Sequence, residues 1–420
     1  MPRRVWLPNV EEALPENDRT YSSVCVPKTL ELVPRFLLCL AKGDAIVTPR
    51  PVERDFSAYI ASVSGLGEPA GWLMSIGARS SPYSLADSIL EDRPLLQRLR
   101  AMGKDGGWTL EPYLQSPRMM RLARETDIPT DKTPSPLVHN GIITRLNDKG
   151  YFKELAQGLG VRTPGGYLVD SMPALEKAID LASREYDDNL MLRKTFFGGG
   201  LGNMPGSKAQ LLARIGEWFD SGRVLVEPFL DLNSVAGSLA AITDDGVEFC
   251  GVDVQTFDDG KWTGFDFPHP DSGLRSEIER LTLLIAWSVR SKMARGYLNV
   301  DWAVTRQKPE EPLALECNFR QNGFAYVLDF ACRYLKARPG ELSIRYREGL
   351  PCSSRGTAEL LVRLSNLKLR GESLLLSRPG QAEGAALMTP PLKGKCSMVV
   401  FSRDPGYTKE AAALLEGCGL

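Results

Sequence analysis

The sequence lacks the features that mark several large classes of protein. It has no apolar run near the ~20 residues of a membrane-spanning helix, and it has only two histidines, His139 and His269. Its eight cysteines include no C-x-x-C pair, which argues against a zinc ribbon or a disulfide framework and favours reduced thiols. Net charge is also nearly absent, because 51 lysines and arginines face 52 aspartates and glutamates. No overall field therefore favours nucleic acid or an anionic membrane.

The first twenty residues contain two arginines but no apolar core, since prolines and acidic residues soon follow. This is not the pattern of a secretory signal, so we expect a cytoplasmic protein. With 420 residues, of which 43% are hydrophobic and 25% charged, the composition is that of a globular protein. At roughly 100–200 residues per domain, the length allows two or three domains.

Residues 1–135 are expected to form one unit. "SSVCVP" and "DAIVTP" have the composition of short strands, and "KTLELVPRFLLCLA" between them that of a helix interrupted by Pro34. Strands that alternate with helices indicate a parallel sheet. "SLADSILEDRPLLQRLRAM" and "SPRMMRLARETD" follow as helices, and the turn-rich "DIPTDKTPSP" ends the unit.

Residues 140–345 show a clearer alternation of elements. The expected helices are "NDKGYFKELAQGLG", "SMPALEKAIDLASREY", "SKAQLLARIGEWFDSG" and "SEIERLTLLIAWSVRSKMA". The expected strands include "NLMLRK", "RVLVEPFL", "SVAGSLAAIT", "VEFCGVDVQTF", "YLNVDWAVT" and "EPLALECNF". Residues 350–420 are expected to form a smaller final unit, with strands "TAELLVRLS" and "CSMVVFS" and a closing helix "KEAAALLEGC".

A glycine-rich stretch, "RKTFFGGGLGN" (193–203), directly follows one of these strands. Glycines allow consecutive N–H groups to turn toward one anion, and Lys194 supplies a cation at the start of the stretch. The alternative is a mobile hairpin tip with no ligand. The chain has no Walker A motif, because its Gly-Lys pairs are followed by Asp, Trp and Cys. "GLGEPA" (65–70), after the strand-like "AYIASVS", is either a weak dinucleotide fingerprint or a plain strand-to-helix turn.

Two carboxylates near the end of the 140–345 unit suggest a metal site. Asp301 lies in one expected strand, and Glu316 and Asn318 lie on the same face of the next. If these strands form a hairpin, Asp301 shares that face, and the oxygen ligands suit magnesium bound together with nucleotide phosphates. Arg320 follows on the same side and could bind a terminal phosphate. An internal salt-bridge network or a solvated charged face remains the alternative.

Four segments resemble, in order, the motifs of the ATP-grasp superfamily. They are the opening helix "NDKGYFKELAQGLGVRTP", the lysine strand and loop "LMLRKTFFGGGLGN", the hinge strand "VLVEPFL" and the metal strands "VDWAV…LALECNFR". They span roughly residues 140–335, about half of the chain, and four motifs in order are far more specific than one. The resemblance implies an α/β (α+β) chain with an ATP-grasp fold at 140–345, preceded by a parallel-sheet pre-ATP-grasp domain at 1–135 and followed by a small C-terminal α/β domain at 350–420.

The resemblance also implies ATP and Mg²⁺ as cofactors and a role for each matching residue. Lys149 and Lys194 would contact the nucleotide phosphates, and Arg320 would hold the reacting phosphate. The loop over the phosphates would comprise Gly198, Gly199, Gly200 and Gly202. The adenine hinge would comprise Glu227, Pro228, Phe229 and Leu230. The metal ligands would be Asp301, Glu316 and Asn318.

The implied activity is that of a carboxylate–amine ligase, which forms an acylphosphate and then an amide. The layout of the whole chain is similar to that of the pheganomycin-type peptide ligases, which join an amino-acid carboxylate to the N-terminus of a peptide. The expected partners are a small-molecule carboxylate and an amine or peptide, with neither nucleic acid nor membrane, and a homodimer is kept open. The alternatives are a nucleotide-binding protein without catalysis and a ligase that uses a non-peptide amine.

Overall fold

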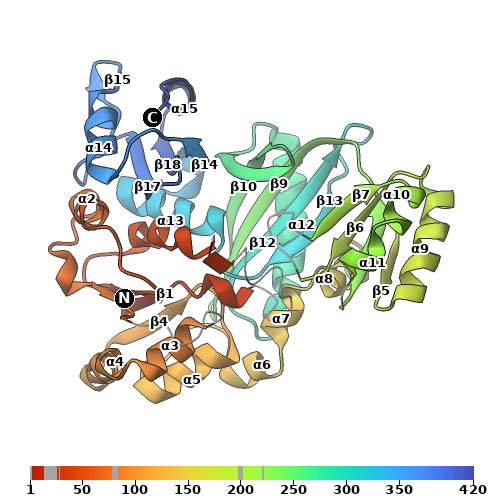
Figure 1. Ribbon diagram of the computed structural model, residues 1–420, viewed down its shortest axis with the longest axis horizontal. Helices are drawn as coiled ribbons and strands as arrows, with labels where there is room; N and C mark the ends of the chain where they lie inside the picture. The colour runs from red at the N-terminus through yellow and green to blue at the C-terminus, as the bar shows by residue number, and fades with distance from the viewer. Residues whose placement is uncertain (1, 14–25, 28, 78–83, 197–201, 220–221) are drawn as a thin grey trace.

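The computed structural model describes residues 2–13, 26–27, 29–77, 84–196, 202–219 and 222–420 (Figure 1). The first unit contains a four-stranded parallel sheet in the order β3-β2-β1-β4. Its strands are β1 (Arg3–Leu7), β2 (Ala45–Thr48), β3 (Leu73–Ser75) and β4 (Trp108–Pro112). The expected parallel sheet is confirmed and "DAIVTP" contains one of its strands. The first strand, "RRVWL", was not expected, and "SSVCVP" lies largely outside the described residues.

Short helices surround this sheet and lead out of it. They are η1 (Val10–Ala13), η2 (Val33–Cys39), α2 (Arg54–Ser64), η3 (Pro69–Gly71), α3 (Leu85–Glu91), α4 (Arg93–Asp105), α5 (Pro117–Thr126), α6 (Ser135–His139) and α7 (Ile142–Leu146). The strand expectation for "AYIASVS" was wrong, because these residues lie in α2 and bury Phe56, Ile60 and Val63 at helical spacing. "GLGEPA" therefore follows a helix, which removes the strand context that a dinucleotide fingerprint needs.

A small antiparallel sheet in the order β5-β8-β6-β7 forms the second unit. It contains β5 (Tyr167–Val169), β6 (Leu190–Lys194), β7 (Asn203–Gly206) and β8 (Val224–Pro228). Helix α8 (Lys149–Gly158) leads into this sheet, and α9 (Met172–Glu185), α10 (Lys208–Leu212) and α11 (Ile215–Trp218) accompany it (Figure 1). The side chain of Asp148 caps α8 by accepting from the Tyr151 N–H, and Ser207 starts α10 with a capping box.

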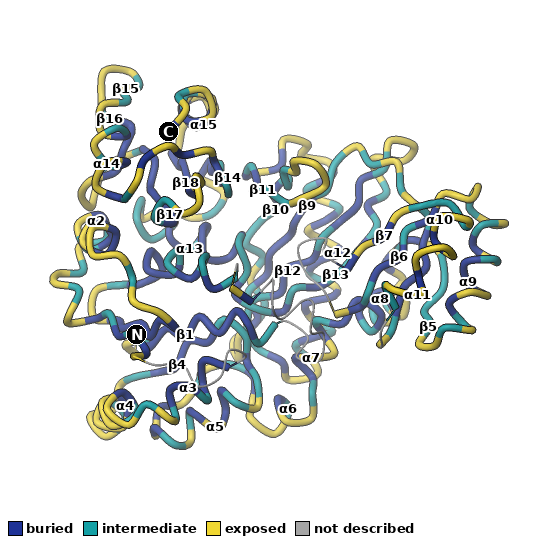
Figure 2. The backbone as a smooth tube through the Cα atoms, in the orientation of Figure 1, coloured by how far each residue is buried: buried dark blue, intermediate teal, exposed yellow. Residues whose placement is uncertain are grey.

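The large central sheet has eight antiparallel strands in the order β13-β12-β9-β10-β11-β14-β18-β17. They are β9 (Leu232–Ile242), β10 (Val247–Asp258), β11 (Lys261–Phe267), β12 (Gly296–Thr305), β13 (Leu313–Asn318), β14 (Ser343–Pro351), β17 (Gly384–Leu392) and β18 (Lys395–Ser402). Helix α12 (Ser272–Ser291) packs with Ala236, Val252 and Trp302 in one hydrophobic core. Helix α13 (Gly323–Leu335) packs with Phe265 and Tyr346 in another, and Figure 2 shows the buried strands between them.

The last strands of the chain continue the central sheet, because β14 pairs with β11 on one side and β18 on the other. The boundary expected between 345 and 350 thus falls within β14, and the division into three domains remains a proposal. The remaining elements are η4 (Pro339–Glu341), α14 (Thr357–Asn366), β15 (Lys368–Leu369), β16 (Glu372–Ser373) and α15 (Pro405–Gly417). None of the helices in the described ranges is long and apolar enough to cross a membrane.

One element of this last part was predicted wrongly. "TAELLVRLS" was expected as a strand but lies in α14. Leu360 and Leu364 are buried four residues apart, whereas Val362 between them is 62% exposed. A strand would have placed Leu360, Val362 and Leu364 on one face, so burial follows the helical period.

Candidate active site

The hairpin of β12 and β13 brings the predicted carboxylates together. Asp301 lies directly opposite Glu316, and Asn299 lies opposite Asn318. Paired residues of antiparallel strands point to the same face, so the two carboxylates and the Asn318 amide form one cluster, as the alternation in the sequence predicted.

Two cations converge on the same oxygen of Glu316. Arg193 Nη2 lies 2.7 Å from Glu316 Oε2, and Lys149 Nζ lies 3.3 Å from it. Both basic side chains are less than a tenth exposed. Burial disfavours the ionised carboxylate, but Lys149 and Arg193 outweigh it, so the pKa of Glu316 is lowered. Burial also lowers the pKa of Lys149, an effect that Glu316 partly offsets.

Arg193 also connects this cluster to the hinge strand β8. Its Nη1 lies 3.3 Å from Glu227 Oε2, while Lys153 Nζ lies 2.7 Å from the other Glu227 oxygen. Lys153 additionally donates to the carbonyl oxygens of Pro164 at 2.6 Å and Gly165 at 3.1 Å. A continuous set of ion pairs therefore joins α8, β6, β8 and β13.

Asp301 is held by amide groups rather than by a cation. Gln255 Nε2 donates to Asp301 Oδ1 at 2.7 Å, and Asn318 Nδ2 donates to Asp301 Oδ2 at 3.1 Å. Burial, followed by the charge of Glu316, raises the pKa of Asp301 to about 7. Near neutral pH this carboxyl is therefore poised between its neutral and charged forms, and a nearby cation would favour the charged form.

Arg320 is oriented by three different parts of the chain. Its Nε donates to the Tyr113 hydroxyl at 3.1 Å, and its two terminal nitrogens donate to the side-chain oxygens of Asn147 and Asn318. Asn147 Oδ1 also accepts from the Phe319 N–H at 3.1 Å. The guanidinium is thus fixed beside the carboxylates by groups that carry no negative charge.

Lys194 lies on the other face of β6. Its Nζ is 5.3 Å from the centre of the Trp218 ring, while the neighbouring Arg193 points to Glu227 and Glu316. The Lys194 N–H donates to the Gly202 carbonyl at 2.9 Å, which closes the β6–β7 hairpin. Gly198, Gly199 and Gly200 lie outside the described residues.

The predicted hinge residues lie at the end of β8 and directly after it. Glu227 is buried in the ion pairs described above, and Pro228 and Leu230 are partly exposed. Phe229 is 44% exposed, and its N–H donates to the Asn189 carbonyl at 2.8 Å. The residues that leave β8 are therefore partly exposed next to the charged cluster.

Structure comparisons identify the architecture. The chain superimposes on N5-carboxyaminoimidazole ribonucleotide synthetase from Thermus thermophilus with a TM-score of 0.55 and 15% identity, covering 98% of this chain and 97% of that one. Biotin carboxylase from Campylobacter jejuni matches with a TM-score of 0.60 and 12% identity, covering 97% and 89%. The chain has the ATP-grasp fold. Residues 33–128 also match the family model of the pre ATP-grasp domain.

A third similar structure carries ligands. N5-carboxyaminoimidazole synthase from Aspergillus clavatus, in complex with ADP and 5-aminoimidazole ribonucleotide, matches with a TM-score of 0.57 and 11% identity, covering 99% of this chain and 97% of that one. A search of curated protein sequences finds no significant match. At such identities the likeness establishes the ATP-grasp fold, and function must be argued from the site.

The residue types of the β12–β13 cluster fit a magnesium ion chemically. Within the part of the chain that the structure describes, no group of three histidine, cysteine, aspartate or glutamate side chains forms a metal site of its own. Asp301, Glu316 and Asn318 instead bring to one face two carboxylates and an amide, groups whose oxygens Mg²⁺ prefers, and the set is incomplete, as is usual when substrate phosphates supply the other ligands.

Several residues of the site were missed in the sequence. Arg193, Lys153, Gln255, Tyr113 and Asn147 all contact the predicted residues. Two had a usable signal. Lys153 lies one helical turn after Lys149, and strand alternation separates Arg193 from Lys194. The other three lie far along the chain from their partners, and no local pattern identifies them.

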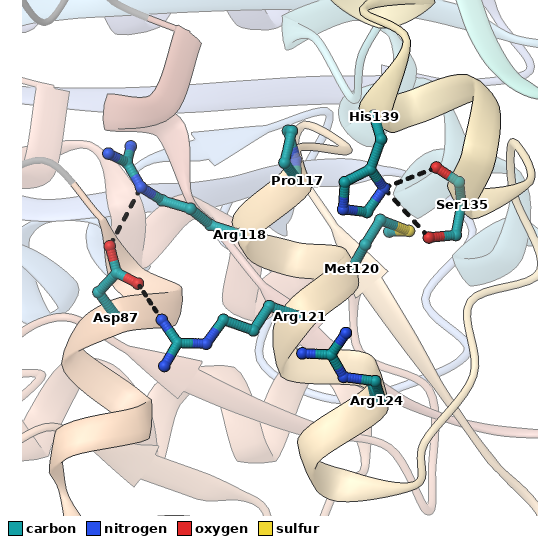
Figure 3. Close-up of a pocket in the computed structure, with 8 residues that line it drawn as sticks. All are labelled: Asp87, Pro117, Arg118, Met120, Arg121, Arg124, Ser135 and His139. Carbon is teal, nitrogen blue, oxygen red and sulfur yellow. Dashed lines mark hydrogen bonds and ion pairs between the residues drawn. The ribbon is translucent and has the colours of Figure 1, made fainter.

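A cavity away from the charged cluster lies between α3, α5 and α6 (Figure 3). It measures about 460 Å³ and is lined by Asp87, Pro117, Arg118, Met120, Arg121, Arg124, Ser135 and His139. Arg118 and Arg121 lie 3.1 and 3.9 Å from Asp87, and His139 Nδ1 lies 2.8 Å from the Ser135 carbonyl oxygen. It shares no residue with the charged cluster. We call it the α5 cavity.

Proposed function

We propose that this protein is an ATP-dependent ligase that joins a carboxylate to an amine and releases ADP and phosphate. The observation that carries the proposal is the convergence on Glu316. Two buried cations from α8 and β6 meet the β12–β13 carboxylates there, with Arg320 alongside. Phosphoryl transfer depends mainly on positioning and on neutralising charge, which such an arrangement provides.

We assign the nucleotide to the space between the small sheet and the β12–β13 hairpin. Glu227 through Leu230 would present backbone groups to the adenine, and Lys149 and Arg193 would contact the phosphates. The ADP complex of the Aspergillus synthase supports a nucleotide on this fold. Lys194 and the glycine stretch would close over the phosphates from the β6–β7 side.

Asp301, Glu316 and Asn318 would hold Mg²⁺, which in such sites neutralises the phosphate charge. Arg320 would bind the oxygens of the phosphate being transferred, because its guanidinium is already aligned by Tyr113 and Asn147. Asp301 would then be ionised, since a bound cation favours its charged form.

For the substrates, we propose an amino-acid carboxylate activated as an acylphosphate, followed by attack of the amine of an amino acid or peptide. This finer assignment rests on the similarity to pheganomycin-type peptide ligases. The contact between Tyr113 of the N-terminal unit and Arg320 supports a substrate site bounded by that unit. Phe265 and Phe267, by contrast, are buried in the core and are not available to a substrate.

The test is release of ADP and phosphate from ATP and Mg²⁺ in the presence of paired amino acids and short peptides, with mass spectrometry of the products. We expect ADP formation that requires both a carboxylate and an amine, and a product lighter by one water than the two together. AMP in place of ADP would refute the acylphosphate route. If the protein binds the nucleotide but turns over none of the substrate pairs, the non-catalytic alternative is favoured. The Glu316→Gln variant serves as the negative control in the same assay.

A further inference from the structure

The oxygens of the proposed metal site are already engaged by groups of the protein. Glu316 Oε2 receives Arg193 at 2.7 Å and Lys149 at 3.3 Å. Both oxygens of Asp301 accept hydrogen bonds, from Gln255 at 2.7 Å and from Asn318 at 3.1 Å. A divalent cation would have to compete with these donors for the lone pairs of Glu316 Oε2 and of Asp301.

Asn318 also faces the wrong way for a metal ligand. Its Nδ2 donates to Asp301 and to Asn299, and its Oδ1 accepts from Arg320. Only the oxygen of an amide can bind Mg²⁺, because the nitrogen is a donor without an available lone pair. The side chain must therefore turn, and release Arg320, before it can complete the oxygen set.

The cluster has more basic than acidic side chains, which favours an anion over a cation. Four basic side chains (Lys149, Lys153, Arg193 and Arg320) face three acidic ones (Asp301, Glu227 and Glu316) among the described residues. Lys153 is tied to Glu227 and to two carbonyls. Arg193 is also tied to Glu227 and to the Leu315 carbonyl. Lys149 and Arg193 share one oxygen of Glu316, and an incoming polyphosphate offers each of them a stronger partner.

We propose that Lys149 and Arg193 keep the Asp301–Glu316–Asn318 site closed to free divalent metal, and that the nucleotide phosphates open it by drawing both cations away from Glu316. This inference rests on the proposed nucleotide site. It makes the two basic residues metal-excluding groups in the empty protein and phosphate ligands in the loaded one. Binding of metal and nucleotide is then coupled through an exchange of ion pairs, and the coupling is reciprocal.

The experiment measures binding of Mn²⁺, as a probe for Mg²⁺, by electron paramagnetic resonance, and binding of ADP by calorimetry. The variants are Lys149→Met and Arg193→Met, each of which removes one competing cation while keeping much of the side-chain volume. We expect tighter binding of free Mn²⁺ in both variants, by a factor within the 5- to 150-fold range of typical coupling, together with weaker binding of ADP. A residue with only a structural role would not shift the two affinities in opposite directions.

Three controls make the result decisive. Arg193→Lys keeps the charge and should bind free Mn²⁺ no better than the wild type. Adding Glu316→Gln to Lys149→Met should abolish the increase in affinity for free Mn²⁺. That result would show that the ion binds at this site. Circular dichroism checks folding, and because Lys149→Met leaves the Arg193 ion pairs in place, it remains informative if Arg193→Met unfolds.

The two proposals fail differently. If free Mn²⁺ binds Lys149→Met and any folded Arg193→Met no more tightly than the wild type, the exchange is wrong, even if ADP binds. If ADP binds neither with nor without metal, the proposed nucleotide site itself is wrong. ADP itself binds Mn²⁺ in solution. A rise in apparent Mn²⁺ affinity on adding ADP therefore does not distinguish the two proposals.

Discussion

Two of the places where basic side chains meet a carboxylate, one at Glu316 and one at Asp87, differ in what surrounds them. At Glu316, the guanidinium of Arg193 and the ammonium of Lys149 are less than a tenth exposed. In the α5 cavity, Arg118 and Arg121 meet Asp87 while their side chains are 37% and 59% exposed. The α5 cavity measures about 460 Å³, yet the buried cluster is the one that we propose as the active site.

The difference lies in the cost of keeping charge away from water. An exposed ion pair contributes roughly 0–1 kcal/mol, because solvent screens it whether or not it has a function. A buried charge is expensive to desolvate and persists only with partners arranged around it. Four basic and three acidic groups in one buried cluster therefore need an explanation, and a polyphosphate ligand provides one. Three arginines on the exposed face of α5 need none.

The largest expected effect is a loss of stability when one member of the buried ion pairs is removed. Arg193→Met leaves Glu227 and Glu316 each short of one partner, so we expect a loss of about 3–5 kcal/mol in the free energy of unfolding. Urea denaturation measures it, with Arg193→Lys as the milder control. A loss no larger than that of an ordinary surface substitution would mean that the buried ion pairs contribute as little to stability as the exposed ion pairs of the α5 cavity.

Glu316→Gln should keep the fold but reduce ATP turnover by at least ~100-fold, because one proposed metal ligand and the partner of two cations loses its charge. Steady-state ADP release and a thermal melt measure the two properties separately. Turnover near the wild-type rate would remove Glu316 from the site and break the comparison directly.

Asp301→Asn should change the pH dependence of stability. The pKa of Asp301 is raised to about 7 by burial in the folded protein and returns to its ordinary value of 3.8 on unfolding. The folded wild type therefore binds the extra proton between these values, and this contribution to stability is lost as the pH rises through about 7. Relative to the wild type, we expect the Asp301→Asn variant to be more stable at pH 8 than at pH 5, by about 2–3 kcal/mol. Melting curves at both pH values test it, and an unchanged difference would contradict it.

The smallest effects should come from the α5 cavity. Arg121→Ala removes a mostly exposed side chain 3.9 Å from Asp87, so stability should change by no more than about 0.5 kcal/mol and ATP turnover should be unaffected. The same melts and ADP assays apply. A clear loss of ATP turnover would show that the α5 cavity contributes to function, contrary to our expectation.

The neighbours Arg193 and Lys194 show where the sequence left a choice open. Both residue types suit a phosphate, and the position beside the glycine stretch favoured the lysine. The direction of the β6 pleat decides between them, because one side chain points to Glu316 and the other to Trp218. Calorimetry of ADP binding to the Lys194→Ala and Arg193→Lys variants would show which cation the nucleotide needs. We expect the larger loss of ADP affinity in the Arg193→Lys variant.

Local patterns determined much of this protein by themselves. The capped start of α8, the hairpin of β12 and β13 and the shared face of Asp301, Glu316 and Asn318 all follow from spacings of a few residues. The same reasoning failed for α2 and α14, where short apolar runs allow either a helix or a strand and only packing decides.

The tertiary structure alone decided which distant groups complete the site. Tyr113 and Asn147 precede Arg320 by 207 and 173 residues, and Gln255 precedes Asp301 by 46. No periodicity extends over such separations. Tyr113 and Asn147 reach Arg320 because the fold brings the residues after β4 and before α8 beside the end of β13. Gln255 reaches Asp301 because β10 and β12 flank β9 in the central sheet. Burial then requires each polar group to find a partner where the chain brings one.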